Sequence, residues 1–370
     1  MKILYVYDKM PGTYQKYLLN LLARLKDKLD VKVLVYANSA KADHSVKRYG
    51  IKDYFQYFLY KIKFSECKSI DVKYMSSYDI VHVQHSFLWR KLEYFKEINR
   101  IPKIIVTLRG GDTYVKPWLG DSWKNFYKNC EHIAAFVVMS QHQKKYLLRW
   151  GVQEEKIHVI PISFGDYSEA KPKYPNPVVL KLVSAFRMTW EKNIEGTIRF
   201  ANILKEKNIP FEFDIYGDGH DLGQLYYMIA RYDLQDFVHV KGKIDNDQLK
   251  EKLPDYDFFV QLSFSEAFPT SVLEAQSVGI PCVVSNSGGL PEAVIKNKTA
   301  LINDFNALEE LAEETITLWK NKELYYSYSK EAISNVNENF SIESELKRLT
   351  TLYQGLFEKN DVSSKMDNNY

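Results

Sequence analysis

The sequence has few cysteines and none in a metal-binding pattern. Cys67, Cys130 and Cys282 are the three cysteines in 370 residues, and they lie far apart without the spacing of a zinc site. An odd number of scattered cysteines argues against a disulfide framework. We therefore expect unpaired thiols in a reducing compartment and assign them no chemistry.

Long hydrophobic runs are also absent. No stretch reaches the roughly 18 consecutive apolar residues that a transmembrane helix needs. Residues 1–8 are typical of a first β-strand, too short and too soon interrupted by charge for a signal peptide. We therefore expect a cytoplasmic protein.

The sequence lacks zinc-finger spacing, an RNP-like aromatic motif and a recognisable recognition helix, so we expect no nucleic-acid partner. Its charge is uneven along the chain. Residues 1–165 hold 28 Lys and Arg against 15 Asp and Glu, a net charge of +13, while the remainder carries −10 and the total is +3. A basic half suits the anionic inner face of a membrane or a lipid-phosphate acceptor, although a solvated lysine-rich surface has the same composition.

Apolar strands alternate with helical patterns along both halves, which predicts doubly wound parallel sheets of the α/β class. A chain of 370 residues also exceeds what one core usually fills, so two domains are expected. Strands are predicted at 3–7, 31–36, 80–83, 103–108, 134–139, 157–160, 179–186, 211–216, 258–262 and 281–285, and late helices at 308–320 and 323–338. The predicted domains are 1–165 and 178–340, with a proline-containing linker at 166–177, a last helix at 341–357 and a flexible tail at 358–370.

An aromatic segment at 51–64 lies between the second and third predicted strands. As a helix it is apolar over a wide arc with lysines at its margins. This pattern fits an interfacial membrane helix, or a buried amphipathic helix whose lysines extend to solvent. We favour the buried interpretation.

The most informative stretch, 263–275, joins the strand at 258–262 to an apolar helix. Glu266 lies in the loop, and Glu274 is expected about two turns into the helix. The first turn, where Pro269 is tolerated, presents free backbone N–H groups and so forms an anion site. Two carboxylates beside an anion suit the hydroxyls of a nucleotide sugar. The alternative is a helix with an acidic beginning and no ligand.

A pair of cations follows the strand at 179–186. Arg187 and Lys192 flank a turn before a helix that begins near Asn193, which is a good N-cap residue. Two cations beside a helix N-terminus suit a diphosphate.

These patterns, together with Ser-Gly-Gly-Leu-Pro-Glu at 287–292, resemble the donor site of retaining GT-B glycosyltransferases of the family-4 (group 1) type. The resemblance covers most of residues 1–357 and is most specific between Ser184 and Val294. It implies two facing Rossmann-like domains with an interdomain cleft and a last helix that crosses back onto the first domain. It also implies transfer of a hexosyl group, with retention of configuration, from a UDP- or GDP-type sugar to an acceptor hydroxyl.

The resemblance assigns the diphosphate to Arg187 and Lys192, the ribose to Glu274, and the sugar hydroxyls or developing charge to Glu266. The remaining donor-binding residues would be Gly217, Lys243, Phe268, Pro269 and Thr270.

In the first domain, Gly12 and His85 are assigned to the acceptor or a phosphate. Arg109 stands where related enzymes commonly carry His, and it is counted with Glu266 as a catalytic candidate. Because Arg cannot act as a base, its expected role is to hold a phosphate or a sugar hydroxyl. A simple pair with Asp112 is the alternative.

No metal and no cofactor besides the nucleotide sugar are predicted. The Asp-x-Asp strings at 245–247 and 255–257 invite a metal, but the first resembles a helix cap and the second runs into a strand. His82 and His85 lack a third ligand and lie on opposite faces of a strand. The glycine string at 217–223 differs in spacing from the dinucleotide fingerprint.

Two other function classes stay open. A nucleotide-sugar epimerase has the same two-domain architecture, and fold does not determine function. A non-catalytic sugar-binding partner of a transferase would bind nucleotide without turnover. For a transferase, the expected acceptor is a surface polysaccharide, a lipid-linked glycan or a glycoconjugate.

Overall fold

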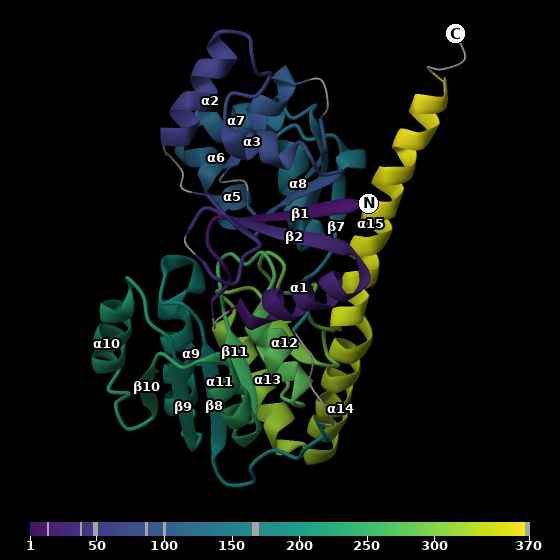
Figure 1. The fold of residues 1–370 in the computed structure, drawn as a ribbon. Coiled ribbons are helices and arrows are strands. Elements are labelled where there is room, and N and C mark those ends of the chain that lie inside the picture. The colour runs from purple at the N-terminus through teal and green to yellow at the C-terminus, as the bar shows by residue number, and fades with distance from the viewer. Residues whose placement is uncertain are drawn as a thin grey trace. The chain divides into compact units, whose positions relative to one another are not determined.

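The computed structural model describes residues 1–12, 15–37, 39–46, 51–85, 88–98, 101–164 and 170–366. The chain divides into two compact units, Met1–Pro161 with Glu345–Tyr370, and Ile162–Ser344. Each unit is a parallel β-sheet with helices packed against it (Figure 1). This architecture confirms the prediction of two Rossmann-like, doubly wound sheets.

The first unit contains a seven-stranded sheet in the order β3-β2-β1-β4-β5-β6-β7. Its strands are largely buried, as expected when helices cover both faces of a parallel sheet. The strands are β1 (Lys2–Tyr7), β2 (Asp30–Val35), β3 (His44–Ser45), β4 (Ile80–Val83), β5 (Lys103–Thr107), β6 (Ile133–Val138) and β7 (Ile157–Val159). The α-helices are α1 (Lys16–Lys28), α2 (Ile51–Lys61), α3 (Ile70–Met75), α4 (Trp89–Leu92), α5 (Gly111–Tyr114), α6 (Lys116–Leu119), α7 (Asp121–Lys128), α8 (Gln141–Arg149) and most of α15 (Ile342–Met366).

The second unit contains a six-stranded sheet in the order β10-β9-β8-β11-β12-β13. Phenylalanine, leucine and isoleucine side chains from both the strands and the helices form its core. The strands are β8 (Leu180–Ala185), β9 (Phe211–Tyr216), β10 (Val238–Gly242), β11 (Phe258–Gln261), β12 (Cys282–Ser285) and β13 (Ala300–Asn303). The α-helices are α9 (Ile194–Glu206), α10 (Leu222–Arg231), α11 (Asn246–Lys252), α12 (Thr270–Ser277), α13 (Leu308–Lys320) and α14 (Lys322–Asn339).

The strand order reverses once in each sheet. In the first unit the reversal lies between β1 and β4, and in the second it lies between β8 and β11. Loops that leave the carboxyl ends of these two strands diverge and leave a crevice, which is where open α/β sheets bind ligands. The two reversals therefore tell us where in each unit to look for a site.

Several sequence-based expectations differ from the structure. Strands β3, β10 and β13 had not been predicted. The last helix continues to Met366, past the start of the flexible tail expected at 358. Residues 166–169 of the predicted linker lie outside the described residues. The part after them is attached to the second unit, because Lys173 N donates to Ser329 Oγ at 2.9 Å and Asn176 N donates to Asp257 Oδ1 at 2.7 Å.

Cys67, Cys130 and Cys282 are unpaired, as predicted, and all three are buried. Across the described part of the chain, no helix combines the length and the apolar character needed to cross a bilayer.

A chain of buried polar side chains fastens α15 to the sheet of the first unit. The Tyr353 hydroxyl bonds to the Tyr5 hydroxyl and lies 2.7 Å from His82 Nδ1. His82 Nε2 is 2.6 Å from Thr107 Oγ1. His82 is thus a buried structural residue, and burial, with a smaller contribution from the charge of Arg109, lowers its pKa from 6.5 to about 3.

We predict that this histidine destabilises the fold in acid. Between about pH 6.5 and 3 the unfolded chain takes up a proton that folded His82 excludes. Its contribution to stability is therefore full above pH 6.5 and decreases as the pH falls, by up to about 1.4 kcal/mol per pH unit. Urea unfolding midpoints measured across this range should depend less on pH in His82→Gln than in wild type. An unchanged pH dependence in His82→Gln, or an equal flattening in the exposed control His220→Gln, would contradict this assignment.

Candidate active site

In the second unit, an ion pair bridges the two loops that diverge at the strand reversal. Lys192, in the loop after β8, donates from its ammonium group to Glu266 Oε2 in the loop after β11. Gln261 Nε2 donates to the same oxygen at 2.8 Å, and Ser271 Oγ donates to Gln261 Oε1 at 2.9 Å. The Glu266 carboxylate is therefore held by two donors, one charged and one neutral.

Backbone hydrogen bonds hold these loops in place. Phe264 N donates to Glu191 O, and Gly289 N donates to Glu266 O, both at 2.8 Å. Gly288 has φ +58°, and a Cβ there would come within 2.2 Å of Glu266 O. Only glycine can bring this turn so close to the Glu266 backbone, which explains part of the 287–292 string.

Asn193 fixes the Lys192 turn. It adopts φ +52° and caps α9, with Oδ1 accepting from Gly196 N at 2.9 Å, as predicted. Its Nδ2 donates to Leu262 O at 2.9 Å. The cap therefore links the start of α9 to the end of β11 and keeps Lys192 beside Glu266.

Two further predicted cations lie at the surface of this unit. Arg187 is 72% exposed and approaches Glu191 Oε1 at 3.3 Å. Lys243 lies 2.9 Å from Asp218 Oδ2 and is also well exposed. Exposed ion pairs contribute only about 0 to 1 kcal/mol, so both cations can exchange these carboxylates for a ligand anion.

Glu274 occupies a different environment from Glu266. Its side chain is 4% exposed, and burial raises its pKa to about 7, against opposing effects from Lys250 and from Asn246. Asn246 Nδ2 donates to Glu274 Oε1 at 2.8 Å. Pro269 is the N-cap of α12 rather than part of its first turn, so Glu274 lies one turn into the helix and not two.

The neighbouring residues contribute mainly through their backbone. Thr270 opens α12, while Phe268 is buried and its ring packs 5.4 Å from the ring of Phe340. The first N–H groups of α12 have no partner within the helix. An anion bound at the start of α12 would therefore be held by backbone groups.

Gly217 lies where the loops after β8 and β9 contact the end of β10. Its N–H donates to Gly242 O at 2.8 Å, and Met188 N donates to Asp218 O at 2.9 Å. Gly217 has φ +133°, and a Cβ there would lie 1.9 Å from Phe186 O. A side chain at this position is incompatible with the observed contact.

In the first unit, two of the predicted residues, Arg109 and His85, each contact the other's loop beside the reversal between β1 and β4. Arg109 Nη2 donates to Gln84 Oε1 at 2.8 Å, from the loop after β5 to the loop after β4. Asp112 Oδ1 accepts the backbone N–H groups of Arg109 and Gly110, each at 3.2 Å, and its Oδ2 lies 3.5 Å from His85 Nδ1. The Arg109 guanidinium thus bonds to an amide, while Asp112 organises the loop.

Gly12 has no steric need to be glycine. A Cβ there would meet no atom within 4 Å, and its carbonyl accepts from Gln15 N at 2.9 Å.

Sequence reasoning missed the partners that orient the predicted residues, namely Gln84, Asn246, Gln261 and Ser271. The sequence held a usable signal for two of these residues, Gln84 and Gln261. Both are buried polar residues at the carboxyl ends of apolar strands, where polar side chains usually serve a site.

The Asp-x-Asp strings have structural roles. Asp245 caps α11 by accepting from Asp247 N and Gln248 N, as predicted for the first string. Asp257 accepts from Asn176 N and Lys181 N at 2.7 and 2.8 Å.

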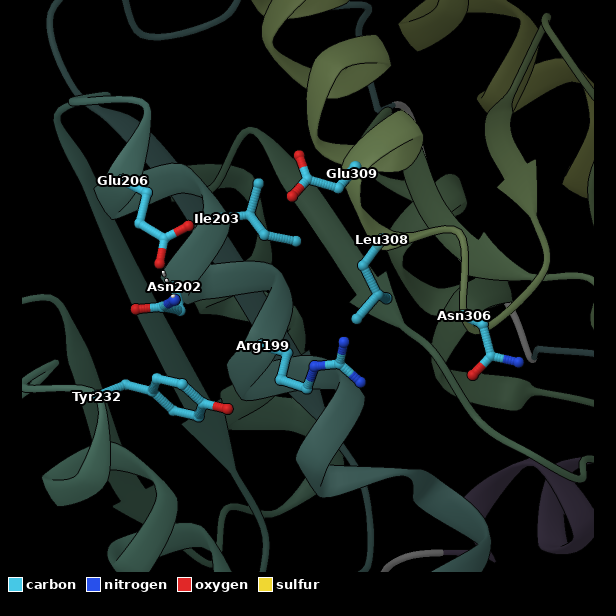
Figure 2. Close-up of a pocket in the computed structure, with 8 residues that line it drawn as sticks. All are labelled: Arg199, Asn202, Ile203, Glu206, Tyr232, Asn306, Leu308 and Glu309. Carbon is cyan, nitrogen blue, oxygen red and sulfur yellow. Dashed lines mark hydrogen bonds between the residues drawn. The ribbon is translucent and has the colours of Figure 1, made fainter.

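A cavity of about 190 Å³ lies between α9 and α13, and none of the predicted site residues lines it (Figure 2). Ile203 and Leu308 form its apolar part, and Asn202 Nδ2 donates to Glu206 Oε1 at 2.7 Å on its rim. Beyond the cavity, Lys207 Nζ, just after α9, lies 3.0 Å from Glu313 Oε1 of α13. We interpret the cavity as a gap between two packed helices. Its lining residues are Arg199, Asn202, Ile203, Glu206, Tyr232, Asn306, Leu308 and Glu309.

Two Rossmann-like units, each with polar residues gathered at its strand reversal, define a GT-B-type protein. Comparison with known families agrees: residues 14–162 match the model of Glycosyltransferase Family 4, and residues 168–335 match that of Glycosyl transferases group 1. The chain belongs to the group 1 glycosyltransferases.

Individual relatives are distant. The N-acetyl-alpha-D-glucosaminyl L-malate synthase of Bacillus anthracis is 24% identical over 90% of this chain and 88% of its own length. The putative colanic acid biosynthesis glycosyltransferase WcaL of Escherichia coli is 30% identical over 45% of this chain and 43% of its own.

Among solved structures, a glycosyltransferase from Rickettsia africae has a TM-score of 0.73 at 20% identity over 96% of this chain and 98% of its own. The structure of HepE from Anabaena in complex with UDP has a TM-score of 0.76 at 15% identity, and the match covers 96% of this chain and 100% of HepE. These structures share the fold.

We predict that Gly217→Ala disrupts the loops that follow β8 and β9. The substitution forces an unfavourable φ and a clash with the Phe186 carbonyl, which should cost about 2 kcal/mol or more of folding free energy. The measurement is the urea unfolding midpoint. Gly223→Ala is the control, because a Cβ there meets nothing within 4 Å and the position lies in α10, where alanine is favoured. Equal midpoints for both variants would show that the close approach is not required.

Proposed function

We propose that this glycosyltransferase transfers a hexosyl group from a nucleoside-diphosphate sugar to an acceptor hydroxyl, with retention of configuration and without a metal ion. The observation that carries the proposal is the pairing of Lys192 with Glu266 at the strand reversal of the second unit. A cation and a carboxylate in contact there offer one group to a phosphate and the other to a sugar hydroxyl.

In this mechanism the diphosphate is bound by cations and backbone N–H groups. Arg187 and Lys192 exchange Glu191 and Glu266 for phosphate oxygens, and the start of α12 adds N–H donors. These groups stabilise the negative charge that develops on the leaving diphosphate, which is usually the largest electrostatic contribution to such catalysis.

The two carboxylates bind different parts of the donor, Glu266 the transferred sugar and Glu274 the ribose. Glu266, once released by Lys192, remains bonded to Gln261 and accepts from the sugar or faces the developing positive charge. Glu274 exchanges Asn246 for the ribose. We propose no covalent intermediate, because no nucleophile was identified in the site.

Named relatives support the donor and acceptor classes. HepE was crystallised with UDP and with UDP and glucose, and a Streptococcus parasanguinis relative is named a UDP-N-acetylglucosamine transferase subunit. The names of two others refer to colanic acid and amylovoran biosynthesis. We therefore propose a UDP-type donor, with GDP as the alternative, and a surface polysaccharide or lipid-linked glycan as acceptor.

Arg109, His85 and Gly12 of the first unit are proposed to contact the acceptor or a phosphate. The bond from Arg109 to Gln84 supports this role, because it fixes the guanidinium without neutralising its charge. An acceptor held at a membrane would require peripheral attachment on the inner face, which the basic first half supports.

The first test is a thermal-shift panel with UDP, GDP, ADP and their sugars. Selective binding of one nucleotide should raise the melting temperature, since a hundredfold excess over Kd stabilises the folded state by about 2.7 kcal/mol. The Arg187→Ala variant should lose most of this shift. The control is Arg199→Ala, which should keep the shift, because Arg199 is an exposed residue beside the cavity between α9 and α13. No shift with any nucleotide, or a full shift in Arg187→Ala, would overturn the assignment of the donor site.

Substitution of Glu274 should affect nucleotide binding, whereas substitution of Glu266 should affect sugar transfer. Glu274 ionises near pH 7, and its ionised form accepts ribose hydrogen bonds better, so nucleotide affinity should rise as the pH rises through about 7. Isothermal titration should show weaker, pH-independent binding in Glu274→Gln.

Glu266→Gln should keep the pH dependence of binding but reduce sugar transfer by on the order of a hundredfold. Full activity in Glu266→Gln, or an unaltered pH profile in Glu274→Gln, would refute the corresponding role.

A further inference from the structure

Helix α2 turns a polar residue inward and its aromatic residues outward. Gln56 is 4% exposed, and its Nε2 donates to Ser65 Oγ at 2.6 Å and to Cys67 O at 2.7 Å. Phe55 and Phe58 are 62% and 56% exposed. The expectation that this segment is buried is therefore wrong.

The exposed residues form one continuous face. At about 100° per residue, Ile51, Tyr54, Phe55 and Phe58 fall within an arc opposite the side that contains Gln56. All four are exposed, and Ile62 and Phe64 extend the apolar surface just beyond the helix. Helices of water-soluble domains normally bury this stripe, and a contiguous apolar patch marks an interaction site.

The helix lies at the periphery of the first unit (Figure 1). Its inward contacts include those with α3.

Lysines border the apolar face. Lys52 and Lys61 flank it on the helix, and Lys63 follows it, all exposed. Lys68 lies over the rings of Tyr60 and Tyr94, 5.3 Å from each centroid. This combination of aromatic residues with a cationic margin matches a helix that lies in the interface of an anionic bilayer. Pairing of two copies through the same face would bring like charges together.

We propose that α2 is a membrane-docking helix. The side chains of Ile51, Tyr54, Phe55 and Phe58 enter the boundary between headgroups and acyl chains, and the bordering lysines contact lipid phosphates. The proposal deepens the membrane part of the proposed function, and it does not depend on the donor-site chemistry.

The test is flotation of the full chain with vesicles of phosphatidylcholine and phosphatidylglycerol, compared with phosphatidylcholine alone. Wild type should float with the anionic vesicles. Phe55→Ser/Phe58→Ser should reduce the partition coefficient by about tenfold or more, because each phenylalanine loses its burial in the interface. Tyr226→Ser/Tyr227→Ser, a matched pair of exposed aromatic residues on α10, should float like wild type.

A charge variant tests the cationic margin. Lys52→Glu/Lys61→Glu should weaken flotation with anionic vesicles and reduce its dependence on salt. The Phe55→Ser/Phe58→Ser variant should keep the nucleotide thermal shift, so loss of membrane binding can be distinguished from failure of the donor site.

Three results would overturn the proposal. Wild type could fail to float with anionic vesicles, or the Phe55→Ser/Phe58→Ser variant could float as well as wild type. Sedimentation without lipid could instead reveal a dimer that this variant abolishes, which would make the face a contact between copies of the chain.

Discussion

Parallel strand pairing is the constraint on which both candidate sites depend. Because every paired strand in each sheet runs in the same direction, all loops that follow the strands emerge at one edge. The reversal of strand order then separates two neighbouring loops and leaves room between them. Lys192 and Glu266 come from such a pair of loops, although 74 positions separate them in the sequence. The same arrangement in the first unit places Gln84 at the reversal and Arg109 in the loop that follows the next strand, β5.

Around Lys192, Glu266 and Glu274, ion pairing and burial determine the properties of the charged side chains. Each cation that we assign to the diphosphate forms an ion pair with a carboxylate, Arg187 with Glu191 and Lys192 with Glu266, so the two positive charges are balanced. In the proposed mechanism, a diphosphate replaces those carboxylates and thereby frees Glu266 for the sugar. Glu274 is controlled differently, because burial rather than a cation determines its ionisation. Two glutamates eight positions apart thus acquire different chemistry from their surroundings.

Helix α2 illustrates a separate principle. Exposing a row of phenylalanine and tyrosine side chains to water is unfavourable, whereas the one amide on the helix is satisfied by internal hydrogen bonds. Such an inversion is consistent with a surface whose normal surroundings are less polar than water. In this interpretation the basic half of the chain supplies long-range attraction and α2 supplies the short-range apolar contact.

The sequence by itself determined the fold class and most, but not all, of the secondary structure. β4, β9 and α13 begin and end at the predicted residues, because apolar runs, their periodicity and flanking turn residues act locally. The cap at Asn193 was predictable for the same reason. The tertiary structure decided which side of α2 faces the core, that Arg109 bonds to Gln84, and that Lys192 pairs with Glu266. These outcomes depend on contacts between segments distant in sequence, and neither periodicity nor local propensity encodes such contacts.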